Sequence, residues 1–107
     1  MKRLEAIPFP EEFMIDLTRC LRQVPVQSAF IFGSSVLEGL NAPDLDLAVV
    51  ADAFEAIPWH RRRELLTLPK GPRCYDLYLF TPREFMRLEG EVPELYERIR
   101  IAEWELV

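Results

Sequence analysis

Two aspartates separated by one residue, Asp44 and Asp46, stand at the start of an otherwise apolar segment. In a β-strand, side chains two positions apart point to the same face, so these carboxylates would lie side by side. Their repulsion disfavours this arrangement by on the order of several tenths of a kcal/mol unless a cation lies between them. Mg²⁺ binds through one or two carboxylates together with substrate phosphates. The pair taken by itself is compatible with a magnesium site, and equally with an Asp44 that ends a turn after Pro43 and an Asp46 that faces water.

A glycine followed by two serines, Gly33, Ser34 and Ser35, comes directly after an apolar run. Glycine allows a sharp turn and a close approach of the backbone to a ligand, and the free N–H groups of a following helix attract anions. The two serine hydroxyls add donors for phosphate oxygens. The segment is a candidate phosphate-binding turn, although the spacing from Ser35 to Glu38 also matches a capping box, in which the serines only cap the helix.

A third acid, Asp76, lies within a segment rich in aromatic and aliphatic residues. An aspartate is unfavourable in a strand by up to about 1 kcal/mol, so its presence there calls for a reason. If this strand lies beside the strand of Asp44 and Asp46, three carboxylates meet. Such a set can hold two metal ions about 3.5–4 Å apart, which align an attacking oxygen, a phosphate and its leaving group. The alternative is an edge-strand aspartate that faces solvent.

Short helices and strands, divided by prolines and glycines, must position these residues. Apolar spacing, with Pro and Gly at the boundaries, predicts helices over 11–22, 34–40, 59–68, 83–88 and 93–101, and strands over 28–32, 44–50, 74–80 and 104–107. Helices that alternate with three or four strands predict an α/β (α+β) fold, a small mixed sheet with helices packed on it. Residues 1–107 are expected to form one domain.

Composition narrows the class of protein. Half of the 107 residues are hydrophobic, and 13 Lys and Arg oppose 18 Asp and Glu, which gives a net charge of −5. These values exclude a disordered tail and a disulfide scaffold, and they argue against an extended nucleic-acid surface, which needs clustered cations. Cys20 and Cys74 have no metal-ligand spacing. With no signal peptide and no apolar run long enough to span a bilayer, we expect a cytoplasmic protein without membrane contact.

The order of these features resembles the DNA polymerase β-type nucleotidyltransferase superfamily. The similarity covers residues 29–52 and the strand of Asp76, and at this length it is closest to the minimal nucleotidyltransferases. It implies a polymerase β-like palm fold in which Gly33 and Ser34, with Ser35 beside them, contact the triphosphate of ATP or another NTP. It also implies that Asp44 and Asp46 bind Mg²⁺, and that Asp76 completes a two-metal site and helps to activate an acceptor hydroxyl.

The family often has a basic residue where this chain has Ser35, and its segment before the Asp-x-Asp pair is slightly longer than residues 35–43. Minimal nucleotidyltransferases are often encoded beside a HEPN-domain protein as a toxin–antitoxin pair. The residues after Asp76 are too few for an acceptor-binding domain. We therefore expect transfer of a nucleoside monophosphate to a hydroxyl on a HEPN or other helical partner, with a homo- or hetero-oligomer possible.

Three other functions are compatible with the same residues. The first is a binding module that neutralises its partner by contact alone, the second a nucleotidyltransferase for a small molecule such as an aminoglycoside, and the third a structural domain whose acids face solvent. The basic cluster at 59–63 is a further candidate for phosphate or acidic-partner contact, although such runs are usually the solvated face of a helix. His60, the only histidine, has no partner at metal-ligand spacing.

Overall fold

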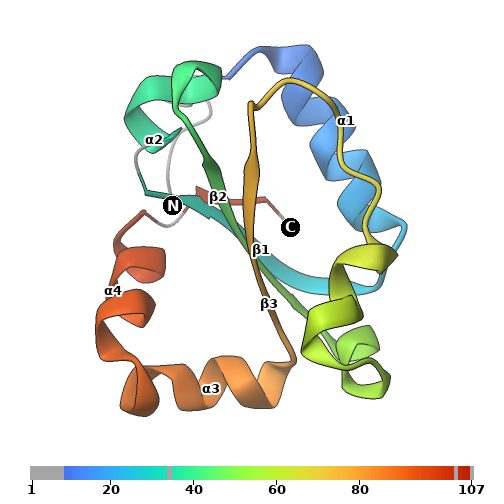
Figure 1. Ribbon diagram of the computed structural model, residues 1–107, viewed down its shortest axis with the longest axis vertical. Coiled ribbons are helices and arrows are strands. Elements are labelled where there is room, and N and C mark those ends of the chain that lie inside the picture. Colours follow the sequence, from blue (N-terminus) through green and yellow to red (C-terminus); the bar gives the residue numbers. More distant parts are fainter. Residues whose placement is uncertain (1–8, 34, 103, 107) are drawn as a thin grey trace.

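Short strands alternate with helices along the whole of the described chain. The computed structural model describes residues 9–33, 35–102 and 104–106, and Figure 1 shows the arrangement. The elements, with 3-10 helices labelled η, are α1 (Glu11–Arg22), β1 (Val26–Phe32), α2 (Ser35–Glu38), η2 (Gly39–Asn41), β2 (Leu45–Ala51), η3 (Asp52–Ala56), η4 (Trp59–Leu65), β3 (Tyr75–Phe80), α3 (Pro82–Glu91), α4 (Pro93–Ala102) and β4 (Trp104–Glu105). None of the helices in these ranges is long and apolar enough to cross a membrane.

The four strands form one mixed sheet in the order β3-β2-β1-β4. β1 runs antiparallel to β2, whereas β2 and β3 are parallel, with Asp46 opposite Asp76. A parallel pair needs a long crossover connection, which η3, η4 and the loop that follows them provide. β4 adds a short antiparallel pairing at Phe30 and Ile31. The predicted α+β class, with a mixed sheet of three to four strands and helices packed on it, is confirmed, and the polymerase β-like palm remains a prediction.

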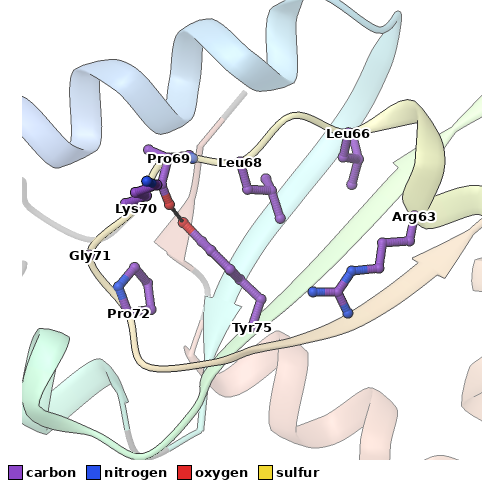
Figure 2. A pocket seen from close by; sticks show the side chains of 8 residues that line it. All are labelled: Arg63, Leu66, Leu68, Pro69, Lys70, Gly71, Pro72 and Tyr75. Carbon is purple, nitrogen blue, oxygen red and sulfur yellow. Dashed lines mark hydrogen bonds between the residues drawn. The ribbon is translucent and has the colours of Figure 1, made fainter.

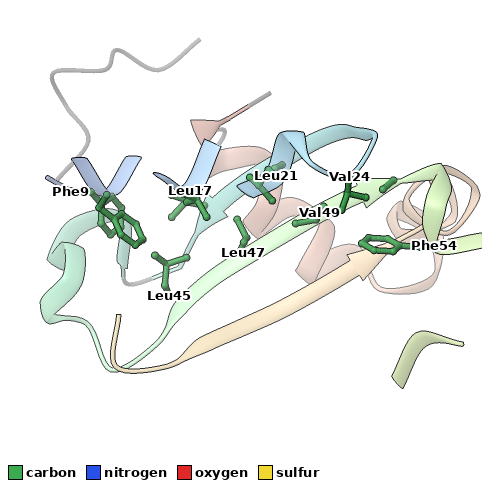
Figure 3. Close-up of a cluster of buried hydrophobic side chains, with 12 residues drawn as sticks. Phe9, Leu17, Leu21, Val24, Leu45, Leu47, Val49 and Phe54 are labelled. Atoms are coloured by element: carbon green, nitrogen blue, oxygen red, sulfur yellow. The ribbon is translucent and has the colours of Figure 1, made fainter. Parts of the chain in front are cut away.

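One face of the sheet carries the larger apolar core, which α1 covers. Leu17 and Leu21 of α1 lie fully buried against β1 and β2, and Figure 3 shows this cluster. The helical spacing of the apolar residues in α1 and the alternation along the strands bring the two apolar surfaces together. The buried members of the cluster are Phe9, Phe13, Leu17, Leu21, Val24, Ala29, Ile31, Leu45, Leu47, Val49, Ala51 and Phe54.

The opposite face packs against α3 and α4, which lie on the other side of the sheet from α1 (Figure 1). Here Phe30 and Phe32 of β1 meet Leu88 of α3 and Ile99 of α4. Because residues alternate between faces, Asp46 and Asp76 belong to this second face. The strand ends that carry the two acids therefore lie in the same layer as α4, away from the larger core.

The predicted helix over 59–68 is wrong in type and length, because residues 59–65 form the 3-10 helix η4. Such tight helices serve as short connectors, and this one is fixed by a buried cation. The Arg62 guanidinium donates to the carbonyl oxygens of Ile57 (3.1 Å) and Leu79 (2.9 Å) and pairs with Glu84. Arg62 is therefore a structural residue, while the rest of the basic cluster at 59–63 is exposed.

The Arg62–Glu84 pair joins η4 to the start of α3. Glu84 also completes a capping box: its carboxylate accepts from the Thr81 backbone N–H, and the Thr81 hydroxyl accepts from the Glu84 N–H. The hydrogen bond with Arg62 lowers the pKa of Glu84, against the opposing effect of burial. One carboxylate thus fixes both the end of β3 and the first turn of α3.

Replacement of Arg62 tests this clamp. We expect Arg62→Ala to lower the free energy of unfolding by about 2–4 kcal/mol, below the loss for a fully buried pair, because the Glu84 side chain is 34% exposed. The matched control is Arg61→Ala, which breaks only an exposed pair with Glu64 and should change stability by less than about 1 kcal/mol. Urea denaturation measures both; equal losses would contradict the structural role of Arg62.

Candidate functional site

Three residues that lie opposite one another across the sheet form the floor of the candidate site. Phe32 of β1 is the register partner of Asp46 in β2, and Asp46 is the register partner of Asp76 in β3. The three side chains therefore share one face in a single row across the strands. Asp46 is nearly buried, with 9% of its surface exposed, whereas Asp76 lies on the outermost strand and is exposed. The register alone brings the two carboxylates together.

The turn that follows β1 packs directly against Asp46. Gly33 has a φ of 77°, a conformation that side chains rarely allow. A Cβ atom at this position would lie 2.0 Å from Asp46 Oδ2. Glycine is therefore needed for two reasons: the backbone conformation disfavours a side chain, and the Asp46 carboxylate leaves no room for one. The Val36 N–H then donates to the Gly33 carbonyl oxygen at 3.2 Å and leads the chain into α2. The glycine bend and the carboxylate thus belong to one site.

The electrostatic environment of Asp46 disfavours its charged form. Burial raises the pKa of Asp46, and the neighbouring charge of Asp76, together with a hydrogen bond between the two carboxyl groups, raises it further. Asp44 adds to the increase by its charge, and the positive charge of Arg98 opposes it. Two carboxylates that share a site without a full counter-charge repel each other, which disfavours their charged forms. A cation bound between them would remove this repulsion.

Two residues flank the acids and complete the site. The Tyr78 hydroxyl donates to Asp76 Oδ2 at 3.1 Å, and burial, followed by the charge of Asp76, raises the pKa of Tyr78. Arg98 of α4 lies 3.7 Å from Asp46 Oδ2, with its guanidinium carbon 5.4 Å from the centre of the Phe32 ring. The Tyr78 ring in turn packs on Phe32, with centroids 5.2 Å apart. The acidic pair is therefore flanked by the aromatic rings of Phe32 and Tyr78 and by the guanidinium of Arg98.

The remaining residues predicted for the site are placed differently. Asp44 is exposed and precedes β2, so it acts on Asp46 through its charge. Ser34 lies outside the described residues, and Ser35 is the first residue of α2. No group of three or more His, Cys, Asp or Glu side chains in the described ranges is arranged to hold a metal ion. The structure brings together Gly33, Asp46 and Asp76, and the metal-binding role of the three aspartates stays a prediction.

The chemistry of the donors fits Mg²⁺ with two protein carboxylates. Mg²⁺ prefers oxygen ligands, keeps several waters, and uses one or two carboxylates with substrate phosphates rather than a cage made by the protein. Asp46 and Asp76 supply two such carboxylates from neighbouring strands. The Gly33 backbone lies directly against one of them, Asp46. These residues could therefore hold a divalent cation together with a phosphate group.

Sequence reasoning did not identify Arg98 or Tyr78 as part of the site. Tyr78 follows Asp76 by two positions, and the two-residue period of a strand places both side chains on one face, so this signal was present. No comparable signal marks Arg98, because its position depends on how α4 crosses the sheet. Burial of the adjacent Ile99 fixes the helix so that Arg98 reaches Asp46.

A separate pocket of about 500 Å³ lies on the face that α1 covers. Figure 2 shows Tyr75, with its hydroxyl bonded to the Pro69 carbonyl oxygen, and Arg63 at one side. The lining residues are Arg63, Leu66, Leu68, Pro69, Lys70, Gly71, Pro72 and Tyr75. Tyr75 and Asp76 are neighbours in β3 and point to opposite faces. The described residues that line this pocket include no carboxylate, and the pocket lies apart from the acidic pair.

Comparisons with known protein families, curated proteins and solved structures gave no significant match. The resemblance to polymerase β-type nucleotidyltransferases therefore remains a prediction from the motifs of this chain alone.

Replacement of Gly33 tests the close contact between the bend and the acid. We expect Gly33→Ala to lower the free energy of unfolding by about 1–3 kcal/mol, because alanine is strained at positive φ and its methyl group displaces Asp46. The matched control is Gly90→Ala, where a Cβ atom meets nothing within 4 Å; in a helix this change should stabilise by about 0.5–1 kcal/mol. Thermal and urea denaturation distinguish the two. A Gly33→Ala protein as stable as the wild type would contradict the contact.

Removal of the Asp46 charge should stabilise the free protein. A carboxyl whose pKa is higher in the folded state makes stability fall as pH rises from 3.8 through the raised value. At pH 7 we therefore expect Asp46→Asn to increase the free energy of unfolding by about 0.2–1 kcal/mol, with a gain that shrinks as pH falls towards 3.8. Asp16→Asn, at an exposed position on α1, should show no gain. Urea denaturation across pH measures both, and a less stable Asp46→Asn protein at pH 7 is the contrary result.

Proposed function

We propose that this protein is a metal-dependent nucleotidyltransferase that uses ATP or another NTP. The observation that carries the proposal is the register pairing of Asp46 with Asp76 beside the Gly33 bend. Paired carboxylates of this kind are costly to a fold unless they bind a cation, and Mg²⁺ bound by them attracts the phosphates of a nucleotide. A carboxyl group whose pKa is raised by burial and by a neighbouring carboxylate, as that of Asp46 is, is typical of functional sites.

The proposed reaction is a displacement at the α-phosphorus. The oxygen of an acceptor hydroxyl forms a new bond to the α-phosphorus, and the bond between that phosphorus and the bridging oxygen of the β-phosphate breaks. Pyrophosphate leaves, and the hydroxyl proton passes to the carboxylate of Asp76, which is exposed and therefore accessible to an acceptor. When bound, divalent cations would supply the positive charge that stabilises the phosphoryl oxygens in such a transfer.

The other residues of the motif have roles that follow from the family resemblance. Asp46 and Asp76, with Asp44 near them, would hold the cations, while Gly33, Ser34 and Ser35 would contact the triphosphate. The acceptor in this proposal is a hydroxyl on a helical partner protein of the HEPN class, which the chain would neutralise as an antitoxin by nucleotide transfer.

Nucleotide binding tests the site directly. We expect ATP to bind the wild type only with Mg²⁺ present, and Asp46→Asn to weaken that binding at least about tenfold, because loss of a charged contact costs about 1.5–3 kcal/mol. Asp76→Asn should act in the same direction, whereas the control Asp16→Asn should bind as the wild type does. Isothermal titration calorimetry with and without Mg²⁺ provides the measurement. ATP binding that ignores Mg²⁺, or survives Asp46→Asn, argues against the proposal.

Transfer itself distinguishes an enzyme from a module that acts by contact. The protein is incubated with a co-purified HEPN partner, Mg²⁺ and ATP labelled at the α-phosphate, and mass spectrometry locates any added nucleotide. An enzyme labels the partner, and Asp46→Asn abolishes the label. Neutralisation of the partner that persists in Asp46→Asn, with no label in the wild type, supports action by contact.

A further inference from the structure

Among the described residues, Arg98 is the cation that lies against the acidic pair. It extends from α4, and its guanidinium Nη2 lies 3.7 Å from Asp46 Oδ2. Within the part of the chain that the structure describes, the charges that act on Asp46 are those of Asp76, Arg98 and Asp44, and of these Arg98 is positive. Asp46 Oδ2 is also the oxygen that lies against the Gly33 bend. Arg98 therefore occupies the side of Asp46 at which a divalent cation and a phosphate would meet.

The Arg98 side chain makes two contacts, one with the Phe32 ring and one with the Asp46 carboxylate. Its guanidinium lies over the buried Phe32 ring, with 5.4 Å between the guanidinium carbon and the ring centre, a contact that stabilises a cation over an aromatic face. The Arg98 side chain is nonetheless 55% exposed, and exposed ion pairs are weak. The contact with Asp46 can therefore break while the contact with Phe32 keeps the guanidinium above the site.

We propose that Arg98 is a nucleotide-positioning residue: in the free protein it pairs with Asp46, and when a divalent cation binds Asp46 it turns to the phosphates of the nucleotide. This inference rests on the proposed function. A planar guanidinium forms paired hydrogen bonds with phosphate oxygens that an ammonium group does not reproduce. Because Phe32 directly precedes Gly33 in the chain, Arg98 already stands beside the expected phosphate-binding turn.

The proposal also explains how an acidic site could receive an anion. The chain has a net charge of −5, and a triphosphate that approaches two carboxylates is repelled unless positive charge lies nearby. Arg98 supplies such a charge within the site before any cation binds. It thus has two opposed effects, since it competes with a divalent cation for Asp46 and assists the binding of the phosphates.

These opposed effects give Arg98 a distinctive signature. We expect Arg98→Ala to bind Mn²⁺ alone about two- to fivefold more tightly than the wild type, because a competing charge is gone. The same variant should bind ATP about tenfold more weakly in saturating Mg²⁺, because a charge-assisted phosphate contact is lost. Arg98→Lys should recover part of the ATP affinity. The control is Arg87→Ala, at an exposed position of α3, and it should change neither.

Titration calorimetry with ATP, paramagnetic relaxation with Mn²⁺, and thermal denaturation of each variant provide the measurements. A change of opposite sign in the two affinities supports the role of Arg98. If the wild type binds Mn²⁺ and ATP but Arg98→Ala weakens both or alters neither, the inference is overturned and the proposed function stands. If the wild type binds neither Mn²⁺ nor ATP, the proposed function fails and the inference falls with it.

Discussion

The parallel register between β2 and β3 forces two carboxylates into one place, and the rest of the structure accommodates this constraint. Asp46 and Asp76 are direct partners across the two strands, so neither can move away without disturbing the sheet. Backbone hydrogen bonds and the buried apolar residues on both faces hold the strands in position. Many weak interactions therefore offset the repulsion between the two carboxylates. None of these interactions has a direct role in the proposed reaction.

The two faces of the sheet have different roles, because one holds most of the apolar core and the other carries the acids. The face under α1 is apolar and supplies most of the buried core, which secures β2 regardless of what its other side carries. The apolar cluster under α3 and α4 is smaller. On this face aromatic rings lie between the core and the acids, and Phe32 contacts both Tyr78 and Arg98. Arg62 closes the far end of β3 and fixes where α3 begins. The position of α4, and with it Arg98, depends on that connection.

Much of this arrangement could be predicted from the sequence, and the exceptions have physical causes. The apolar periodicity of α1 and the strand patterns around Ala48 and Leu77 are local, so the elements and the alternation of Asp46 between core residues were predictable. Strand order is not local: nothing in residues 74–80 indicates that β3 pairs with β2 in parallel. The position of η4 depends on contacts of Arg62 with Leu79 and Glu84, which are distant in the sequence, and the position of Arg98 depends on the packing of Ile99. Contacts of this kind are absent from any short window of sequence.

The place of β3 at the border of the sheet determines how the acids meet their surroundings. In the part of the chain that the structure describes, no strand pairs with the outer side of β3, and the side chain of Asp76 on this border strand is exposed. Asp46, one strand inward, is nearly enclosed. Under the proposed function, a macromolecular acceptor would approach the exposed Asp76, while the divalent cation and the nucleotide phosphates would bind at the less accessible Asp46. The difference in exposure between the two partnered acids would, under the proposed function, assign the acceptor to Asp76 and the nucleotide to Asp46.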